Sequence, residues 1–250
     1  MPYSADFFNS HRAGSASSAA RMVPLIMELT GARSVIDVGC GIGTWLAEFG
    51  ARGVSDVLGV DGPWVNPAQL AIPRERFVAA DLSLKLPVDR TFDLAISMEV
   101  AEHLPAFSAD GFVDSLTKLA PIVVFSAAIP MQGGTDHVNE QWPGYWASKF
   151  ETRGFHAIDC LRPLVWNADD VEWWYAQNTV VYASDRALAA SSRLREALTR
   201  YGGKPLPLVH PRCLIARVTQ PIGLRRMLRE FPTAITGALR AKTGTGNNAP

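Results

Sequence analysis

A glycine-rich turn between two apolar runs is the first group of residues with a recognisable chemical use. The segment from Val35 to Trp45 (VIDVGCGIGTW) predicts a buried strand, a tight turn and the start of a helix. Glycine has no Cβ, so such a turn lets the backbone approach a ligand closely. Asp61 and Asp81 end two later apolar runs, and a carboxylate after the second strand of a doubly wound sheet binds ribose hydroxyls. Together these residues predict a nucleoside-binding cleft.

A second polar cluster ends another apolar run, in the segment from Phe92 to Pro105 (FDLAISMEVAEHLP). Glu99, Glu102 and His103 are spaced so that a helical turn after the strand would place all three on one side. In open α/β folds ligands bind at the carboxyl edge of the sheet, where this segment must lie. We therefore expect these side chains beside the nucleoside cleft.

The elements that position these residues alternate between strand and helix. Strands are expected at 34–38, 57–60, 76–80, 92–97, 122–127, 155–160 and 178–183, and helices at 15–29, 44–49, 109–119, 141–152 and 169–177. The strands are continuous apolar runs, as in a sheet that is covered on both faces. This alternation predicts an α/β fold with a doubly wound, seven-stranded, mostly parallel sheet.

Composition limits the classes of function. Lys plus Arg equals Asp plus Glu at 24 each, whereas a protein that binds duplex nucleic acid usually has a basic excess. The three cysteines are scattered, which suits a reducing cytoplasm. No apolar run reaches the roughly 20 residues that span a bilayer, and the N-terminus lacks the apolar core of a signal peptide. We expect a soluble, cytoplasmic protein that does not bind nucleic acid.

The glycine segment resembles motif I of the class I S-adenosylmethionine-dependent methyltransferases, which have a Rossmann-like fold. The resemblance implies that the glycines bind the methionine part of the cofactor, that the first acid orients this loop or the amino group, and that the two later acids bind the ribose and the adenine. For the two later acids the alternative role is a helix cap or a turn residue. The implied cofactor-binding residues are Asp37, Gly39, Gly41, Gly43, Asp61, Asp81, Leu82 and Met98.

The pattern Glu-x-x-Glu-His resembles coenzyme-Q biosynthetic O-methyltransferases and small-RNA 3′-end 2′-O-methyltransferases, in which it is associated with a divalent cation. The RNA enzymes have a further histidine after the fifth strand, and His137 lies in that region here. The resemblance implies that Glu99, Glu102, His103 and His137 hold Mg²⁺, Mn²⁺ or Zn²⁺. Such an ion would lower the pKa of a substrate hydroxyl and orient the alkoxide.

Metal-free roles for the same residues stay open at this point. Glu99 can contact the cofactor, Glu102 can cap the next helix, and His103 can satisfy the backbone. Alternatively, His103 or His137 is a general base, since the unperturbed pKa of histidine lies near the operating pH.

Residues 1–183 form the predicted S-adenosylmethionine-binding domain, in which an aromatic-rich region at 142–175 supplies acceptor-pocket elements. Residues 184–250 are predicted to be a peripheral C-terminal extension. Glycines and prolines favour extended chain at 184–216, and the last eight residues are expected to be disordered. Residues 221–242 mix apolar side chains with Arg and Lys, so this basic tail is either a solvated terminal helix or an amphipathic helix on the anionic inner membrane surface.

Over about residues 3–183 the chain resembles a bacterial methyltransferase group that is often found with glycan-assembly genes. We therefore expect an O-methyltransferase that acts on a hydroxyl of a sugar, a glycan or another small polyol, assisted by a divalent metal. One alternative is a metal-free natural-product O- or N-methyltransferase with His137 as the base. Another is a non-catalytic cofactor-binding partner protein that docks through its tail. The acceptor, the metal and the oligomeric state are not determined by these residues.

Overall fold

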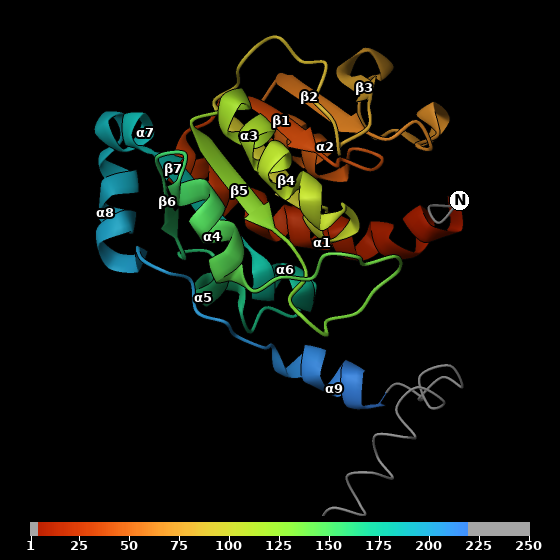
Figure 1. The fold of residues 1–250 in the computed structure, drawn as a ribbon. Coiled ribbons are helices and arrows are strands. Elements are labelled where there is room, and N and C mark those ends of the chain that lie inside the picture. The colour runs from red at the N-terminus through yellow and green to blue at the C-terminus, as the bar shows by residue number, and fades with distance from the viewer. Residues whose placement is uncertain (1–4, 220–250) are drawn as a thin grey trace, which may run out of the picture. The chain divides into compact units, whose positions relative to one another are not determined.

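The computed structural model describes residues 5–219 of the chain, with side chains from residue 13. Seven strands form one sheet in the order β3-β2-β1-β4-β5-β7-β6, and β7 alone runs antiparallel to its neighbours (Figure 1). This confirms the predicted doubly wound, mostly parallel sheet. The strands are β1 Ser34–Val38, β2 Asp56–Asp61, β3 Phe77–Ala79, β4 Leu94–Met98, β5 Ile122–Ser126, β6 Phe155–Ile158 and β7 Val180–Ser184.

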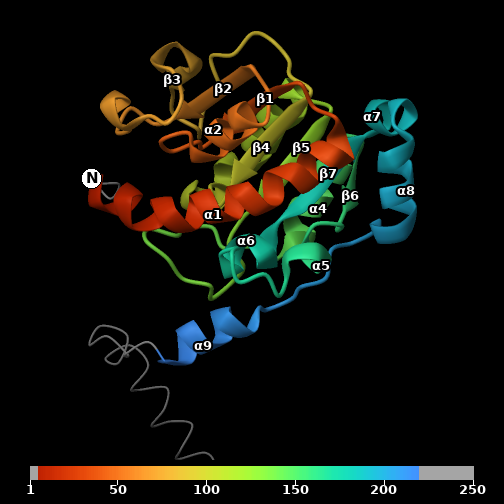
Figure 2. The same cartoon turned by 180° about the vertical axis from the view of Figure 1, so that it is seen from behind.

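Helices cover both faces of this sheet. The α3 and α4 helices lie in front of it in Figure 1, and α1 crosses the opposite face in Figure 2. The helices are α1 Ala5–Thr30, α2 Thr44–Ala51, α3 Ala109–Leu119, α4 Pro143–Glu151, α5 Arg162–Val165, α6 Trp173–Asn178, α7 Asp185–Ala190, α8 Ser192–Tyr201 and α9 Pro211–Thr219.

Each strand contributes alternate residues to two separate cores. In β1, Val35 packs in the core under α1 and α2, whereas Ile36 packs in the core under α3 and α4. Burial on both faces explains why the strands are continuous apolar runs in the sequence. Two layers of helix on one sheet therefore follow from the apolar content of the strands.

The order of the strands reverses at β1. Strands β2 and β3 follow on one side of β1, and the chain then returns to place β4 on its other side. Strand β1 pairs in parallel with β2 on one side and with β4 on the other, so that Asp37 lies opposite Gly59 and Ile96. The connections that leave β1 and β4 pass to opposite faces of the sheet, so the ligand crevice of this type of fold is expected at the carboxyl ends of these strands. Both polar clusters predicted from the sequence follow one of these two strands.

The segment after residue 183 differs from the predicted extended chain. Residues 185–190 and 192–201 form α7 and α8, and Leu188 and Leu194 are buried in the core that α1 covers. Irregular chain is confined to residues 202–210, where the Arg162 guanidinium donates to the carbonyl of Leu206. One compact unit of the chain extends from Met1 to Cys213, 30 residues past the expected domain boundary at 183.

The second compact unit is Leu214–Pro250, of which the structure describes residues 214–219 within α9. The basic tail at 221–242 and the last eight residues lie outside the described residues. Among the helices of residues 5–219, none is long and apolar enough to cross a membrane.

Candidate active site

The glycine loop connects β1 to α2 at the crevice. Gly39, Gly41 and Gly43 have φ values of 89°, 53° and 82°, a region that favours glycine. A Cβ on Gly39 would lie 2.2 Å from a methyl carbon of Val100, so the space at this position also requires glycine. The alternating glycines seen in the sequence are therefore explained by the backbone conformation of a tight, closely approached turn.

The Asp61 carboxylate, at the end of β2, holds this loop in place. One of its oxygens accepts a hydrogen bond from the Gly41 N–H and the other accepts one from the Gly62 N–H, both at 2.6 Å. Burial raises the pKa of Asp61, and these two bonds, with a third from the Trp64 side chain, offset part of that effect. The carboxylate is thus fixed beside the glycine loop before any ligand arrives, and its predicted role at a ribose stays a prediction.

The other predicted cofactor residues divide into buried and exposed ones. Asp37 is 2% exposed, and burial raises its pKa well above the usual value, with a further contribution from Asp61. Leu82 and Met98 are buried. Asp81 is exposed, and one of its oxygens accepts from both the N–H and the hydroxyl of Ser83. Asp81 therefore has the turn geometry that the sequence left open as its alternative role.

A separate cluster of potential metal ligands follows β4. One ligand atom from each of Glu102, His103 and His137 lies within 4.8 Å of the other two. The rings of His103 and His137 meet edge to face at a centroid distance of 4.8 Å. The structure therefore brings together three of the four residues that the sequence predicted as metal ligands.

The fourth residue, Glu99, is not part of this group, although its carboxylate lies next to that of Glu102. The predicted helical turn is a 3₁₀ turn that begins at Ala101, and Glu99 has a φ of 57° before it. Because the turn starts after Glu99, the expected spacing of three and four residues on one side does not include it. The Glu99 carboxylate instead accepts hydrogen bonds from Gln132 at 2.9 Å and from Asn178 at 3.0 Å.

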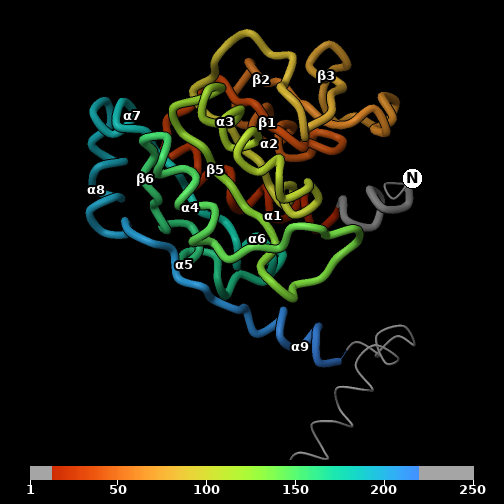
Figure 3. The backbone as a smooth tube through the Cα atoms, viewed as in Figure 1, coloured from red at the N-terminus to blue at the C-terminus, as the bar shows by residue number. Residues whose placement is uncertain are grey.

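The loop between β5 and α4, which Figure 3 traces as a tube, contains His137. The N–H groups of Val138 and Asn139 donate to the carbonyl of Glu102 at 2.8 and 3.0 Å, which ties this loop to the 3₁₀ turn. The Nδ1 atom of His137 lies 2.9 Å from a carboxylate oxygen of Glu140. That carboxylate also accepts from two backbone N–H groups of the loop, so it fixes the ring of His137 in place.

The carboxyl group of Glu102 is poorly compensated by its surroundings. Glu102 is fully buried, and neither of its oxygens has a hydrogen bond of normal geometry within the described residues. Burial raises the pKa of Glu102 well above its usual value and the Glu99 carboxylate raises it further, while backbone N–H groups offset only part of this. Burial and the neighbouring His137 lower the pKa of His103 to about 4. Glu102 is thus a buried carboxylate beside a neutral imidazole. A metal ion bound between them would supply the positive charge that the carboxylate lacks.

Four buried or half-buried carboxyl groups lie at or just after the carboxyl ends of β1, β2 and β4. Asp37, Asp61, Glu99 and Glu102 all have raised pKa values for which burial is the largest cause. Within residues 13–213 the lysines and arginines form their ion pairs with other carboxylates. Buried carboxylates are normally paired or neutralised, so this group fits a ligand that carries positive charge.

Several residues around these clusters were not predicted from the sequence. Glu140 supports His137, and the amides of Gln132, Gln177 and Asn178 form a buried network that ends on Glu99. The amide of Gln177 also accepts from the backbone N–H of His210. Glutamine and asparagine have no distinctive spacing, so only the tertiary structure shows that they meet.

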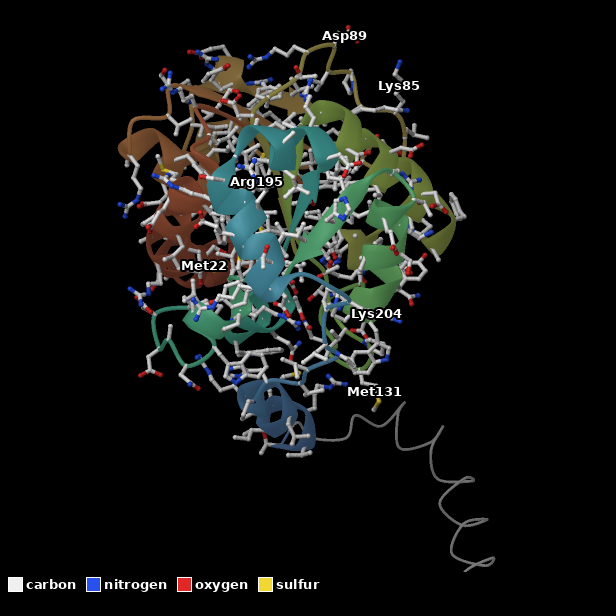
Figure 4. All side chains as sticks on the ribbon, turned by 90° about the vertical axis from the view of Figure 1, so that its left-hand side faces the viewer. Met22, Lys85, Asp89, Met131, Arg195 and Lys204 are labelled. Carbon is white, nitrogen blue, oxygen red and sulfur yellow. The ribbon has the colours of Figure 1, made fainter. Side chains whose placement is uncertain are left out.

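The aromatic region predicted to form the acceptor pocket has mixed roles. Trp146 is 2% exposed and packs against Phe125 in the core. Trp142 is 41% exposed, and Met131, on the loop that carries His137, projects into solvent at the rim of the molecule (Figure 4). Trp142 and Met131 are therefore surface residues, whereas Trp146 is part of the core.

Comparison with known protein families identifies the chain. Residues 11–169, more than half of the sequence, match the family model described as a methyltransferase domain. The chain belongs to this family of methyltransferases. With the sheet order and glycine loop described above, it is a class I S-adenosylmethionine-dependent methyltransferase. No curated protein sequence matches this chain.

Solved structures share the fold at low sequence identity. The S-adenosylmethionine-bound amino pentose methyltransferase CalS10 from Micromonospora echinaspora is 17% identical, with a TM-score of 0.52 over 72% of this chain and 97% of that one. The magnesium protoporphyrin IX methyltransferase from Synechocystis is 18% identical, with a TM-score of 0.50 over 70% and 84%. The methyltransferase domain of a bacterial CtHen1 is 18% identical, with a TM-score of 0.50 over 68% and 98%. In contrast, the chain spans 58% of the matched DesVI structure from Streptomyces venezuelae. At these identities the comparisons show the fold.

Proposed function

We propose that this methyltransferase transfers a methyl group from S-adenosylmethionine to a hydroxyl of a sugar, a glycan or another small polyol, with the help of a divalent metal ion. The observation that carries this proposal is the cluster of Glu102, His103 and His137, which contains a buried carboxylate without a hydrogen bond of normal geometry among the described residues. The cluster follows β4, the strand next to the one that leads into the glycine loop.

The glycine loop and the buried carboxylates support the cofactor part of the proposal. S-adenosylmethionine carries a positive sulfonium and an ammonium group, and the crevice contains several acids without a paired lysine or arginine in residues 13–213. In this arrangement Gly39, Gly41 and Gly43 would contact the methionine part and Asp61 would bind the ribose. Asp81 and Leu82 would lie at the adenine, with Met98 beside the cofactor.

The chemistry of the donor set supports the metal part. Two imidazoles and one carboxylate suit Zn²⁺ or Mn²⁺ better than Mg²⁺, which prefers oxygen ligands. The Glu140 carboxylate next to Nδ1 of His137 is the kind of outer partner that orients a metal-bound histidine. When bound, such an ion lowers the pKa of a substrate hydroxyl. Glu102, His103 and His137 would hold it, and neighbouring hydroxyls of a polyol would approach from the open side.

The same His137–Glu140 contact favours a second candidate, which is methyl transfer without a metal. A carboxylate at Nδ1 holds the imidazole so that Nε2 can accept a proton from the acceptor, as in other acid–histidine pairs. In that case His137 is the general base, and the acceptor can carry a hydroxyl or an amine.

Calorimetry of metal-stripped protein tests both candidates. The protein is titrated with S-adenosylhomocysteine and then with Mn²⁺, Zn²⁺ and Mg²⁺ in turn. We expect cofactor binding, and one metal per chain that is lost in His103→Ala and Glu102→Gln. His156→Ala is the matched control, because His156 lies on the surface and pairs with Asp185.

The outcomes distinguish metal-assisted methyl transfer from methyl transfer without a metal. Cofactor binding without any metal isotherm would remove the metal and leave His137 as the base. Failure to bind S-adenosylhomocysteine would contradict the cofactor site itself. Loss of metal in the His156→Ala control would show that the isotherm comes from a surface site.

A further inference from the structure

The Glu99 carboxylate is surrounded by hydrogen-bond donors that carry no charge. Nε2 of Gln132 donates to one of its oxygens at 2.9 Å, and Nδ2 of Asn178 donates to both, at 3.0 and 3.2 Å. The ion pairs that lysines and arginines form within residues 13–213 do not include Glu99. Glu99 is therefore held as a hydrogen-bond acceptor without a lysine or arginine partner in that part of the chain.

A third amide, that of Gln177, connects the two donors. Its Nε2 atom donates to Oε1 of Gln132 at 2.9 Å and to Oδ1 of Asn178 at 3.0 Å. Nδ2 of Asn178 also donates to Oε1 of Gln132 at 2.9 Å. All three residues, which together are the amide network, are buried. A buried polar network of this kind is rigid when its members are paired with one another.

Two backbone N–H groups decide which way these amides face. The N–H of His210 donates to Oε1 of Gln177 at 2.8 Å. The N–H of Ile129 donates to Oε1 of Gln132 at 3.2 Å. Because a backbone N–H can only donate, it fixes the oxygen end of each amide and leaves the other end to donate onward. The donor from Gln177 fixes the oxygen of Asn178 in the same way, so the network presents N–H groups to the carboxylate.

The irregular chain at 202–210, which supplies the first of these N–H groups, is fastened to the rest of its compact unit. Nε2 of His210 donates to the carbonyl of Trp166 at 2.8 Å. The buried guanidinium of Arg162 donates both to a carbonyl of this irregular chain and to the carbonyl of Gln177. The family match ends at residue 169, so this chain and two members of the amide network lie outside it.

We propose that the amide network positions the Glu99 carboxylate for a cationic group of the bound ligand, and that the chain at 202–210 sets the orientation of the network. The cationic groups of S-adenosylmethionine are one source of this charge. A metal ion is the other, because the Glu102 carboxylate lies next to Glu99. A carboxylate that is oriented in advance binds a cation at a lower cost in lost freedom. The proposal rests on the proposed function, to which it adds the residues that orient Glu99.

Calorimetry of Gln177→Glu tests the network at a residue whose hydrogen bonds do not include Glu99. Glutamate keeps an acceptor for the N–H of His210 but places a second acceptor where Gln177 donates, so the amide of Asn178 turns its oxygen toward Glu99. S-adenosylmethionine or Mn²⁺ should then bind about tenfold more weakly or worse. Asn167→Asp is the matched control, since it makes the same change from amide to carboxylate on an exposed residue and should leave both affinities unchanged.

A double-mutant cycle with Glu99→Gln separates positioning from a general loss of structure. Gln132→Met, which removes a donor without adding charge, is the second variant and serves if Gln177→Glu does not fold. If the network acts through Glu99, either change should alter ligand affinity by less than about twofold once Glu99 is replaced. Melting temperatures of all variants are measured alongside.

The ligands identify the cationic group. A loss for S-adenosylmethionine that exceeds the loss for S-adenosylhomocysteine assigns it to the sulfonium, and equal losses assign it to the ammonium group that both share. A loss confined to Mn²⁺ assigns it to the metal.

Equal effects of the network variants with and without Glu99, or unchanged affinity for all three ligands, would overturn this proposal and leave the proposed function intact. Failure of the unmodified chain to bind S-adenosylhomocysteine would contradict the proposed function itself, and this proposal with it.

Discussion

Replacement of Glu102 by methionine should stabilise the metal-free protein while removing the metal. Methionine has a similar volume, so the change needs little repacking. The Glu102 carboxylate is fully buried, without a normal hydrogen bond in the described residues, and next to the Glu99 carboxylate. A buried polar group in this state costs about 1–3 kcal/mol of stability. The free energy of unfolding should therefore rise by about that amount, because the backbone carbonyl of Glu102 keeps its two bonds to the loop.

The measurement is urea unfolding with a chelator present, followed by calorimetry with Mn²⁺. In thermal unfolding of a chain of this size, each kcal/mol in the free energy of unfolding shifts the melting temperature by about 2–4 °C. Glu48→Met is the control, since Glu48 pairs with Arg52 on the surface of α2 and its loss should have little effect. A clear loss of stability in Glu102→Met would refute the reasoning, because it would show that the carboxylate has a structural partner in the metal-free protein.

Three further predictions test other parts of the molecule. Asp61→Ala should weaken S-adenosylhomocysteine binding by about 1.5–3 kcal/mol, measured by calorimetry, and unchanged affinity would place the ribose elsewhere. Arg162→Met should lower the free energy of urea unfolding by about 3–5 kcal/mol, since it leaves the Asp159 carboxylate without its buried partner, and a change below about 1 kcal/mol would argue against that ion pair. The Arg90 guanidinium lowers the pKa of Asp56 from its ordinary value of 3.8, so this pair stabilises the protein above that pH and the effect is lost as the pH falls further. Stability measured from pH 5 to pH 3 should fall less in Arg90→Ala than in the unmodified chain, and parallel curves would contradict the assignment.

The sequence by itself determined the fold and the glycine loop. The apolar runs at 34–38 and 122–126 are strands in the structure because burial on both faces of a parallel sheet demands continuous apolar residues. The glycines at alternate positions predicted the tight turn after β1, because only glycine readily adopts the positive φ values found there. These features depend on local conformation and on periodicity, which a sequence records directly.

Tertiary structure decided which side chains share a site. His137 is 34 residues from His103, and their contact depends on the two hydrogen bonds that tie the loop to Glu102. Glu99 lies next to Glu102 but is not part of the ligand group, and its hydrogen-bond partners come from two distant segments.

The same limit applies to the chain after residue 183. The glycines and prolines that favoured extended structure lie at 202–211, and residues 202–210 are irregular chain as expected. The extension of that prediction to 185–201 was wrong, because α7 and α8 are rich in Ala, Leu and Arg, which favour helix, and because Leu188 and Leu194 are buried in the core. Burial of a leucine is worth about 1.5–3 kcal/mol, and a sequence without its fold does not show which surface will be available for that packing.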